Sequence, residues 1–161
     1  MKTRFLSVSS ILAVALLIAG TLIIGADAAT KTVSPENRLS IAQPKESGQW
    51  KAYDLTIEYT YSRNQGHLDL SGNVRFASYL TLGYARLDNF RLGAVFLDEN
   101  GKVLQEIGLT TNRGSLEPIS FNRKIDLPQN AVYMAFSYDG KAISAGGMGA
   151  GPITFTFYPI H

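Results

Sequence analysis

The sequence predicts an all-β domain, namely a two-sheet antiparallel β-sandwich of the immunoglobulin-like or jelly-roll type with about eight strands. Three observations support this prediction. Short runs in which polar and apolar residues alternate recur from Trp50 to Phe157. Clusters of Gly, Asn, Asp, Ser and Pro separate these runs, as expected of turns. After the N-terminal apolar segment, no stretch shows the apolar spacing that is typical of an amphipathic helix.

The first two strands are predicted to form a hairpin. In YDLTIEYTY (53–61), aromatic and aliphatic residues alternate with Asp, Thr and Glu, which is the period of a half-buried strand. SRNQG (62–66) has the composition of a turn, and HLDLSGNVRF (67–76) alternates again. Further along, Leu80, Leu82 and Tyr84 define one face of another predicted strand.

The second half of the chain contains two runs that are apolar on both faces, at residues 92–97 and 131–138. Such runs are typical of central strands that are covered on both sides. Residues 98–101 predict a hairpin turn, because Gly101 can adopt the positive φ that the turn requires. The other predicted strands are residues 103–109, 119–127 and 153–157.

The N-terminal segment predicts export. Lys2 and Arg4 precede the apolar stretch ILAVALLIAGTLIIG (11–25), and Ala26-Asp27-Ala28 matches the small-x-small pattern of a signal peptidase site. We therefore expect residues 1–28 to be a cleaved signal peptide and the protein to be periplasmic or extracellular. The alternative is an uncleaved N-terminal anchor helix, since about 20 apolar residues span a bilayer.

Residues 29–49 are rich in Ser, Pro, Lys, Glu and Gln and show no apolar periodicity. This composition predicts a flexible linker, which would act as a stalk if the anchor were retained. The folded domain is then expected over residues 50–161. That length suits one domain with a core of its own.

The composition excludes several kinds of site and partner. The 161 residues contain no cysteine, so neither a disulfide nor a thiolate metal site nor a cysteine nucleophile can form. The formal net charge is +2 and no basic cluster is present, so we expect no nucleic-acid partner. We expect membrane contact only through the N-terminal segment, if it is uncleaved. No cofactor is expected.

The glycine-rich run SAGGMGAGP (144–152) does not match a nucleotide-binding loop. Such loops open a helix whose free N–H groups bind the phosphates, whereas Pro152 and a strand pattern follow this run. We interpret the run as a connector between two strands. Met148, at its tip, is a candidate contact for a ligand or partner, because surface loops often carry binding.

The polar residues do not form a recognisable catalytic set, and the sequence therefore predicts a protein that is not an enzyme. His67 has Asp69 two residues further on, and His161 is the last residue, so neither belongs to a triad or to a set of metal ligands. Asp54 and Glu58 share one strand face at roughly 13 Å, estimated from the strand rise. This separation exceeds that of glycosidase carboxylate pairs.

Exposed tyrosines are the remaining candidate ligand contacts. Tyr133 lies opposite in phase to Met134 and Phe136, which predicts that its ring faces outward, and Tyr138 ends the same apolar run. Outward-facing rings would provide a platform for sugars, whereas rings in the core with the hydroxyl at its rim are the alternative.

Taken as a whole, the sequence predicts an exported, non-catalytic β-sandwich binding or interaction module of the cell envelope. Its partner is expected to be an envelope protein or a polysaccharide. Two alternatives stay open: a carbohydrate-binding module that uses exposed tyrosines, and a membrane-tethered structural or accessory subunit.

Overall fold

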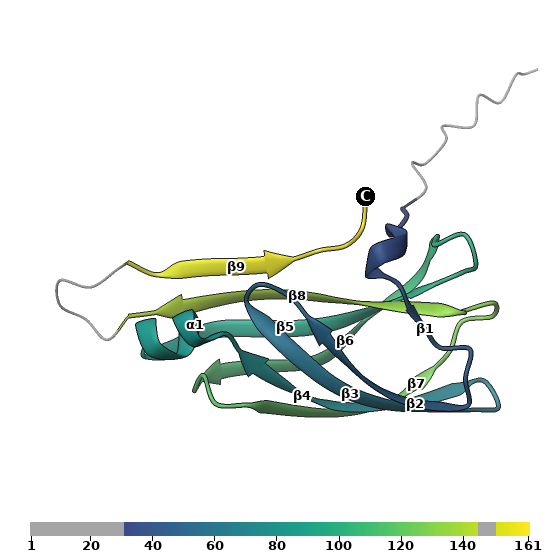
Figure 1. Ribbon diagram of the computed structural model, residues 1–161, viewed down its shortest axis with the longest axis horizontal. Coiled ribbons are helices and arrows are strands. Elements are labelled where there is room, and N and C mark those ends of the chain that lie inside the picture. The colour runs from purple at the N-terminus through teal and green to yellow at the C-terminus, as the bar shows by residue number, and fades with distance from the viewer. Residues whose placement is uncertain (1–30, 145–150) are drawn as a thin grey trace, which may run out of the picture.

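The computed structural model describes residues 31–144 and 151–161, and this part of the chain forms two antiparallel sheets and very little helix (Figure 1). The four-stranded sheet contains, in spatial order, β2 (Lys45–Lys51), β3 (Leu55–Asn64), β4 (His67–Phe76) and β7 (Ile119–Asp126). The five-stranded sheet contains β1 (Leu39–Ser40), β8 (Tyr133–Ile143), β5 (Arg86–Leu97) and β6 (Val103–Gly114), and β9 (Ile153–Phe157) also pairs with β8. The helices of the described part are η1 (Pro35–Asn37) and α1 (Ser78–Gly83).

The four-stranded sheet follows directly from the alternation in the sequence. The predicted hairpin is confirmed: β3 and β4 pair from Leu55–Phe76 to Asn64–His67. Gln65 and Gly66 adopt positive φ in the turn between them. Buried residues alternate with more exposed ones along β3 and along most of β4. One face of this sheet is therefore apolar and the other is polar.

In the five-stranded sheet, β5 and β8 are neighbours and both are central, as their two-sided apolar runs predict. The predicted turn between β5 and β6 is also confirmed. Asp98 Oδ1 accepts hydrogen bonds from the backbone N–H groups of Asn100 and Lys102, each at 2.9 Å. Gly101 has a φ of 82°, the left-handed conformation that favours glycine.

The apolar faces of the two sheets meet in one core that is rich in aromatic rings. The centroid of the Tyr59 ring on β3 lies 5.6 Å from that of Phe136 on β8, and the rings of Phe76 and Phe90 are 5.1 Å apart. Trp50 on β2 packs against Phe136 at 5.7 Å. Tilted and edge-to-face pairs of this kind add to the stabilisation from apolar burial.

Residues 31–49 belong to the folded domain and are not the flexible linker that the sequence predicts. β1 and most of β2 lie in this range, and Val33 and Ile41 are fully buried. The prediction was wrong because these buried residues stand singly between polar ones and produce no periodicity. Residues 1–28 lie outside the described part.

The strand predicted from Leu80, Leu82 and Tyr84 is instead the short helix α1. This segment carries the chain from β4 in one sheet to β5 in the other (Figure 1). Leu80 is buried in the core, whereas Leu82 is 87% exposed. The alternation in the sequence did not reflect a strand, because no neighbouring strand pairs with this crossing segment.

The two ends of the described chain pair with each other on the outer face of the five-stranded sheet. Thr32 and His161 exchange backbone hydrogen bonds at 3.2 and 2.9 Å, and Val33 forms a bridge with Ile160. Figure 1 shows the C-terminus next to the segment around η1. Together the two ends form a small second apolar cluster with Val95, Leu97 and Ala135. They therefore cover one end of this face.

Candidate functional site

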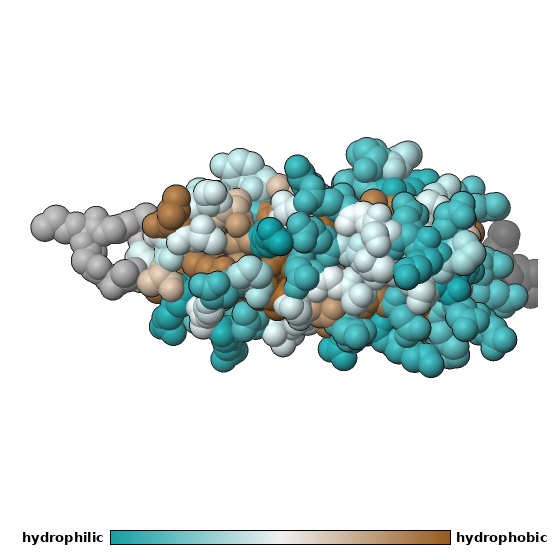
Figure 2. Space-filling model, turned by 60° about the horizontal axis from the view of Figure 1, so that its bottom comes forward, coloured by the Kyte–Doolittle hydropathy of each residue, from teal (hydrophilic) through white to brown (hydrophobic). Residues whose placement is uncertain are grey.

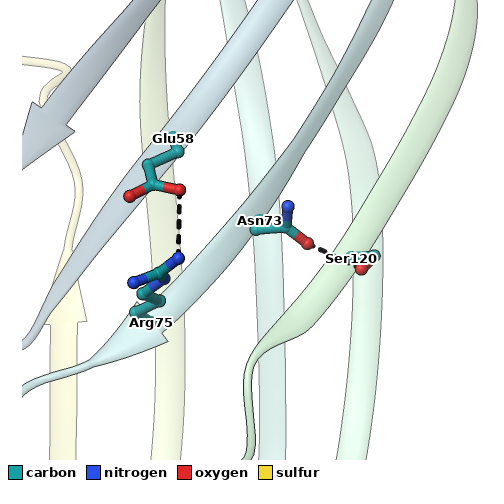
Figure 3. A network of polar contacts seen from close by, with 4 residues as sticks. All are labelled: Glu58, Asn73, Arg75 and Ser120. Atoms are coloured by element: carbon teal, nitrogen blue, oxygen red, sulfur yellow. Dashed lines mark hydrogen bonds and ion pairs between the residues drawn. The ribbon is translucent and has the colours of Figure 1, made fainter.

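The outer face of the four-stranded sheet is polar and largely satisfied by its own contacts. Figure 2 turns this side of the molecule forward and shows mainly hydrophilic residues, with hydrophobic ones emerging toward the end that carries α1. Glu58 and Arg75 form an ion pair at 3.4 Å, and Ser120 Oγ donates to Asn73 Oδ1 at 2.6 Å (Figure 3). These four side chains therefore already have partners on this face.

The outer face of the five-stranded sheet carries a groove of about 300 Å³ beyond the part that the chain ends cover. Its floor is formed by Gly93, Gly108 and Ser137, which are neighbours in register on β5, β6 and β8. Two of these residues have no side chain and the third has a short one, so a trough crosses three strands. We call it the Tyr158 groove. Its longer side chains are Arg91, Glu106, Asp139 and Tyr158.

The two glycines of the floor have different effects on the groove. A Cβ atom at Gly93 would lie 2.8 Å from Ser137 Oγ, so this position is closely packed. A Cβ atom at Gly108 would meet nothing within 4 Å. Gly108 therefore leaves open space above the sheet rather than relieving a close contact, and a side chain there would partly fill the groove.

Tyr158 extends across the sheet into this groove. It follows β9, yet its hydroxyl donates to Glu106 Oε2 on β6 at 2.8 Å, although β8 and β5 lie between these two strands. Lys31 Nζ lies 3.6 Å from the other carboxylate oxygen of Glu106. The hydrogen bond to Glu106, assisted by partial burial, raises the pKa of Tyr158. The side chain is thus held in place while the residue stays 53% exposed.

Neither of the two tyrosines that the sequence predicts as ligand contacts has an exposed ring. Tyr133 is half-buried at the covered end of the sheet, with the guanidinium carbon of Arg38 6.0 Å from its ring centroid. Tyr138, the other candidate contact, is only 5% exposed, because it shares the core-facing phase of Phe136. Met148 lies outside the described residues. Most of the glycine-rich run also lies outside them, and the strands that flank it, β8 and β9, pair antiparallel.

Asp54 is a buried carboxylate that links three elements at one end of the domain. It precedes β3, and its Oδ2 accepts a hydrogen bond from the Tyr138 hydroxyl on β8 at 2.6 Å. Its Oδ1 accepts a second hydrogen bond from the Tyr79 hydroxyl on α1. Burial, followed by these bonds to Asp54, raises the pKa of both tyrosines. The cluster has the character of a structural cross-link between the sheets, because both carboxylate oxygens are already occupied.

The histidine considered from the sequence has a different partner. His67 Nδ1 lies 2.7 Å from Asp126 Oδ1 on β7, in an exposed pair, and not next to a set of metal ligands. Within residues 31–144 and 151–161, no group of three or more His, Asp or Glu side chains could hold a metal ion. In the same ranges, no helix has the length and apolar character needed to cross a membrane.

The fold and the groove together define a two-sheet antiparallel domain that presents an open groove with an aromatic wall and a few polar side chains on one outer face. No family model, curated protein or solved structure matches this chain. Sequence reasoning missed Tyr158, Glu106 and Arg91. The available signal was the pair Gly93 and Gly108, since glycines inside two strands of one predicted hairpin indicate a place where the sheet surface is left open.

Proposed function

We propose that the protein is an exported, non-catalytic β-sandwich binding module of the cell envelope that holds a saccharide chain in the Tyr158 groove. The observation that carries the proposal is the half-exposed ring of Tyr158 in the wall of an open groove, where its hydroxyl is held by Glu106, whose carboxylate also pairs with Lys31. Export to the envelope is supported by the predicted signal peptide over residues 1–28.

The chemistry of the groove fits a sugar ring. A sugar presents an apolar C–H face that packs on an aromatic ring, and a rim of hydroxyl groups that need donors and acceptors. Tyr158 supplies the ring, and Arg91, Asp139 and Ser137 supply polar groups around it. Because Tyr158 is already held in place, little side-chain entropy is lost on binding. The carboxylate of Glu106 is occupied in holding Tyr158 and Lys31, which favours binding over catalysis.

We infer that the sandwich is of the immunoglobulin-like rather than the jelly-roll type. In support, β3, β4 and β7 are consecutive neighbours in one sheet, and β6, β5, β8 and β9 follow one another in the other. The chain changes sheet between β4 and β5, between β6 and β7, and between β7 and β8, which gives Greek-key connections. β2 then extends the smaller sheet beside β3.

Replacing Tyr158 by alanine is expected to weaken binding of the chain from Ala29 onward to its saccharide by about tenfold, which corresponds to about 1.4 kcal/mol. The stacking surface is lost, while Tyr158→Phe keeps the ring and is expected to have a smaller effect. The measurement is calorimetric titration with soluble envelope polysaccharides, after retention on an insoluble panel selects one. Tyr53→Ala is the matched control, because Tyr53 is 84% exposed but does not line the groove. Equal losses in the two alanine variants would contradict the proposal.

A further inference from the structure

A second hollow, of about 400 Å³, lies next to the Tyr158 groove on the outer side of β5 and β6. It shares Arg91 with the groove, and the other residues that line it are Asn89, Phe90, Thr111, Asn112 and Arg113. Arg91 pairs with Thr111 in register, and Arg113 lies two residues further along β6. The two arginines are thus diagonal neighbours across adjacent strands, with backbones about 7–8 Å apart.

An irregularity in β5 shapes this hollow. The register of β5 shifts between Leu87 and Phe90 against β6, and between Leu87 and Asn89 against β8. Bulges of this kind change the direction of side chains and are frequent next to binding sites. At this bulge, Asn89 Oδ1 is buried and accepts no hydrogen bond from the described residues. An unpaired buried acceptor is unfavourable, and native proteins contain few of them.

The two arginines of the hollow have no acidic partner within the described part of the chain. The ion pairs found there join Lys31 to Glu106, His67 to Asp126, Arg75 to Glu58 and Lys141 to Asp88. The nearest carboxylates on β5 and β6 are therefore already paired with lysines. Asp139 lies opposite Arg91 on β8, but it forms no ion pair with Arg91 within 4.0 Å. Like charges on neighbouring strands repel, so this arrangement favours an anion between the arginines.

We infer that the saccharide in the Tyr158 groove is acidic and that Arg91 and Arg113 bind its carboxylate in the adjoining hollow. The inference rests on the proposed function and specifies the ligand class. A guanidinium group donates two parallel hydrogen bonds to a carboxylate, which gives both affinity and orientation. With the sugar ring on Tyr158, a uronate residue next to it in the chain would bring its carboxylate to Arg91 and Arg113.

The test compares an oligogalacturonate with its fully methyl-esterified form, because the two probes share one backbone and differ in charge. We expect the chain from Ala29 onward to bind the acid at least tenfold more tightly than the ester at low salt. Arg113→Gln and Arg91→Gln should each reduce this ratio about tenfold, and Arg91→Lys should retain part of it. Arg86→Gln is the matched control: it removes one exposed arginine of β5 that lines neither hollow, and it should leave the ratio unchanged.

The outcomes separate the two proposals. Equal binding of acid and ester by the wild-type chain would overturn the acidic preference and leave saccharide binding in place. A preference for the acid that survives both arginine substitutions would overturn the assignment to Arg91 and Arg113. Binding of neither probe would overturn the inference of a uronate ligand, whereas the polysaccharide panel and Tyr158→Ala test saccharide binding separately. A preference that weakens as salt is raised from low to high concentration would support the charge pairing.

Discussion

Asp54→Ala is expected to lower the free energy of unfolding by about 3 kcal/mol, since two hydrogen bonds to a buried carboxylate are lost and two tyrosyl hydroxyls lose their acceptor. The effect should be large because the Asp54 carboxylate is the link between the start of β3, helix α1 through Tyr79, and β8 through Tyr138. The backbone carbonyl of Asp54 also accepts a hydrogen bond from Ala77 N–H at 2.8 Å. The measurement is urea unfolding of the wild type and the variant at neutral pH.

Three further variants test whether the carboxylate acts as a shared acceptor. Asp54→Asn keeps the shape but offers only one acceptor oxygen, so about half of the loss is expected. Tyr138→Phe should cost less than Asp54→Ala, and adding it to Asp54→Ala should cost little more. Asp69→Ala, an exposed carboxylate on β4, is the control and should change stability by less than about 0.5 kcal/mol. Equal stability of Asp54→Ala and the wild type would show that the cluster does not join the sheets.

The protein is expected to lose stability steeply above pH 10. Burial, followed by the hydrogen bond to Glu46, raises the pKa of Tyr61 from its ordinary value of 10.0 to about 12. The pKa values of Tyr79 and Tyr138 are also raised by burial and by their bonds to Asp54. A raised pKa means that the neutral phenol is favoured in the folded state. This stabilisation is complete below pH 10 and is lost as the pH rises toward the folded pKa.

The sign and size of this pH-dependent stability loss follow from how many protons the folded and the unfolded chain bind. Above pH 10 the unfolded chain releases phenolic protons that the folded chain retains, so each such tyrosine lowers the free energy of unfolding by up to about 1.4 kcal/mol per pH unit. Urea unfolding at pH 8, 10 and 11 measures the slope. Tyr61→Phe should make the fall in stability shallower between pH 10 and 11, whereas replacement of the exposed Tyr53 by phenylalanine should not. A free energy of unfolding that stays constant from pH 8 to 11 would contradict the burial of these phenols.

The strands that could be predicted are those in which the spacing of apolar residues indicates whether one face or both faces are buried. β3 and β4 alternate, and the central strands β5 and β8 are apolar on both faces, so local composition was sufficient. β2 (KESGQWK) was missed because it is an edge strand on which Trp50 is the one large apolar residue, and a single residue gives no period. The short crossing helix α1 was mistaken for a strand because Leu80, Leu82 and Tyr84 alternate with other residues, although Leu80 is the only one of them that is buried.

The candidate site depends on contacts between residues that are far apart in the sequence, and no local sequence pattern indicates such contacts. Tyr158 and Glu106 are 52 residues apart in sequence and meet because the C-terminal segment crosses the outer face of the sheet. Arg91 and Arg113 become neighbours through the register of the β5–β6 hairpin, including its bulge. The burial of Tyr138, in contrast, was already implied by the sequence. If Tyr133 faces outward, the even-numbered residues Met134 and Phe136 of the same strand must face the core. Tyr138 is also even-numbered, so it faces the core with them.

The most direct test of the binding account is to map which backbone amides of the chain from Ala29 onward respond to a bound saccharide by NMR. Titration with the oligogalacturonate is expected to shift the amide signals of Gly93, Gly108 and Ser137 and to broaden those near Arg113. Signals from the outer face of the four-stranded sheet, such as Asn73 and Ser120, should stay in place. Shifts confined to Asn73 and Ser120, or no shifts at saturating saccharide, would contradict the assignment of the Tyr158 groove as the binding site.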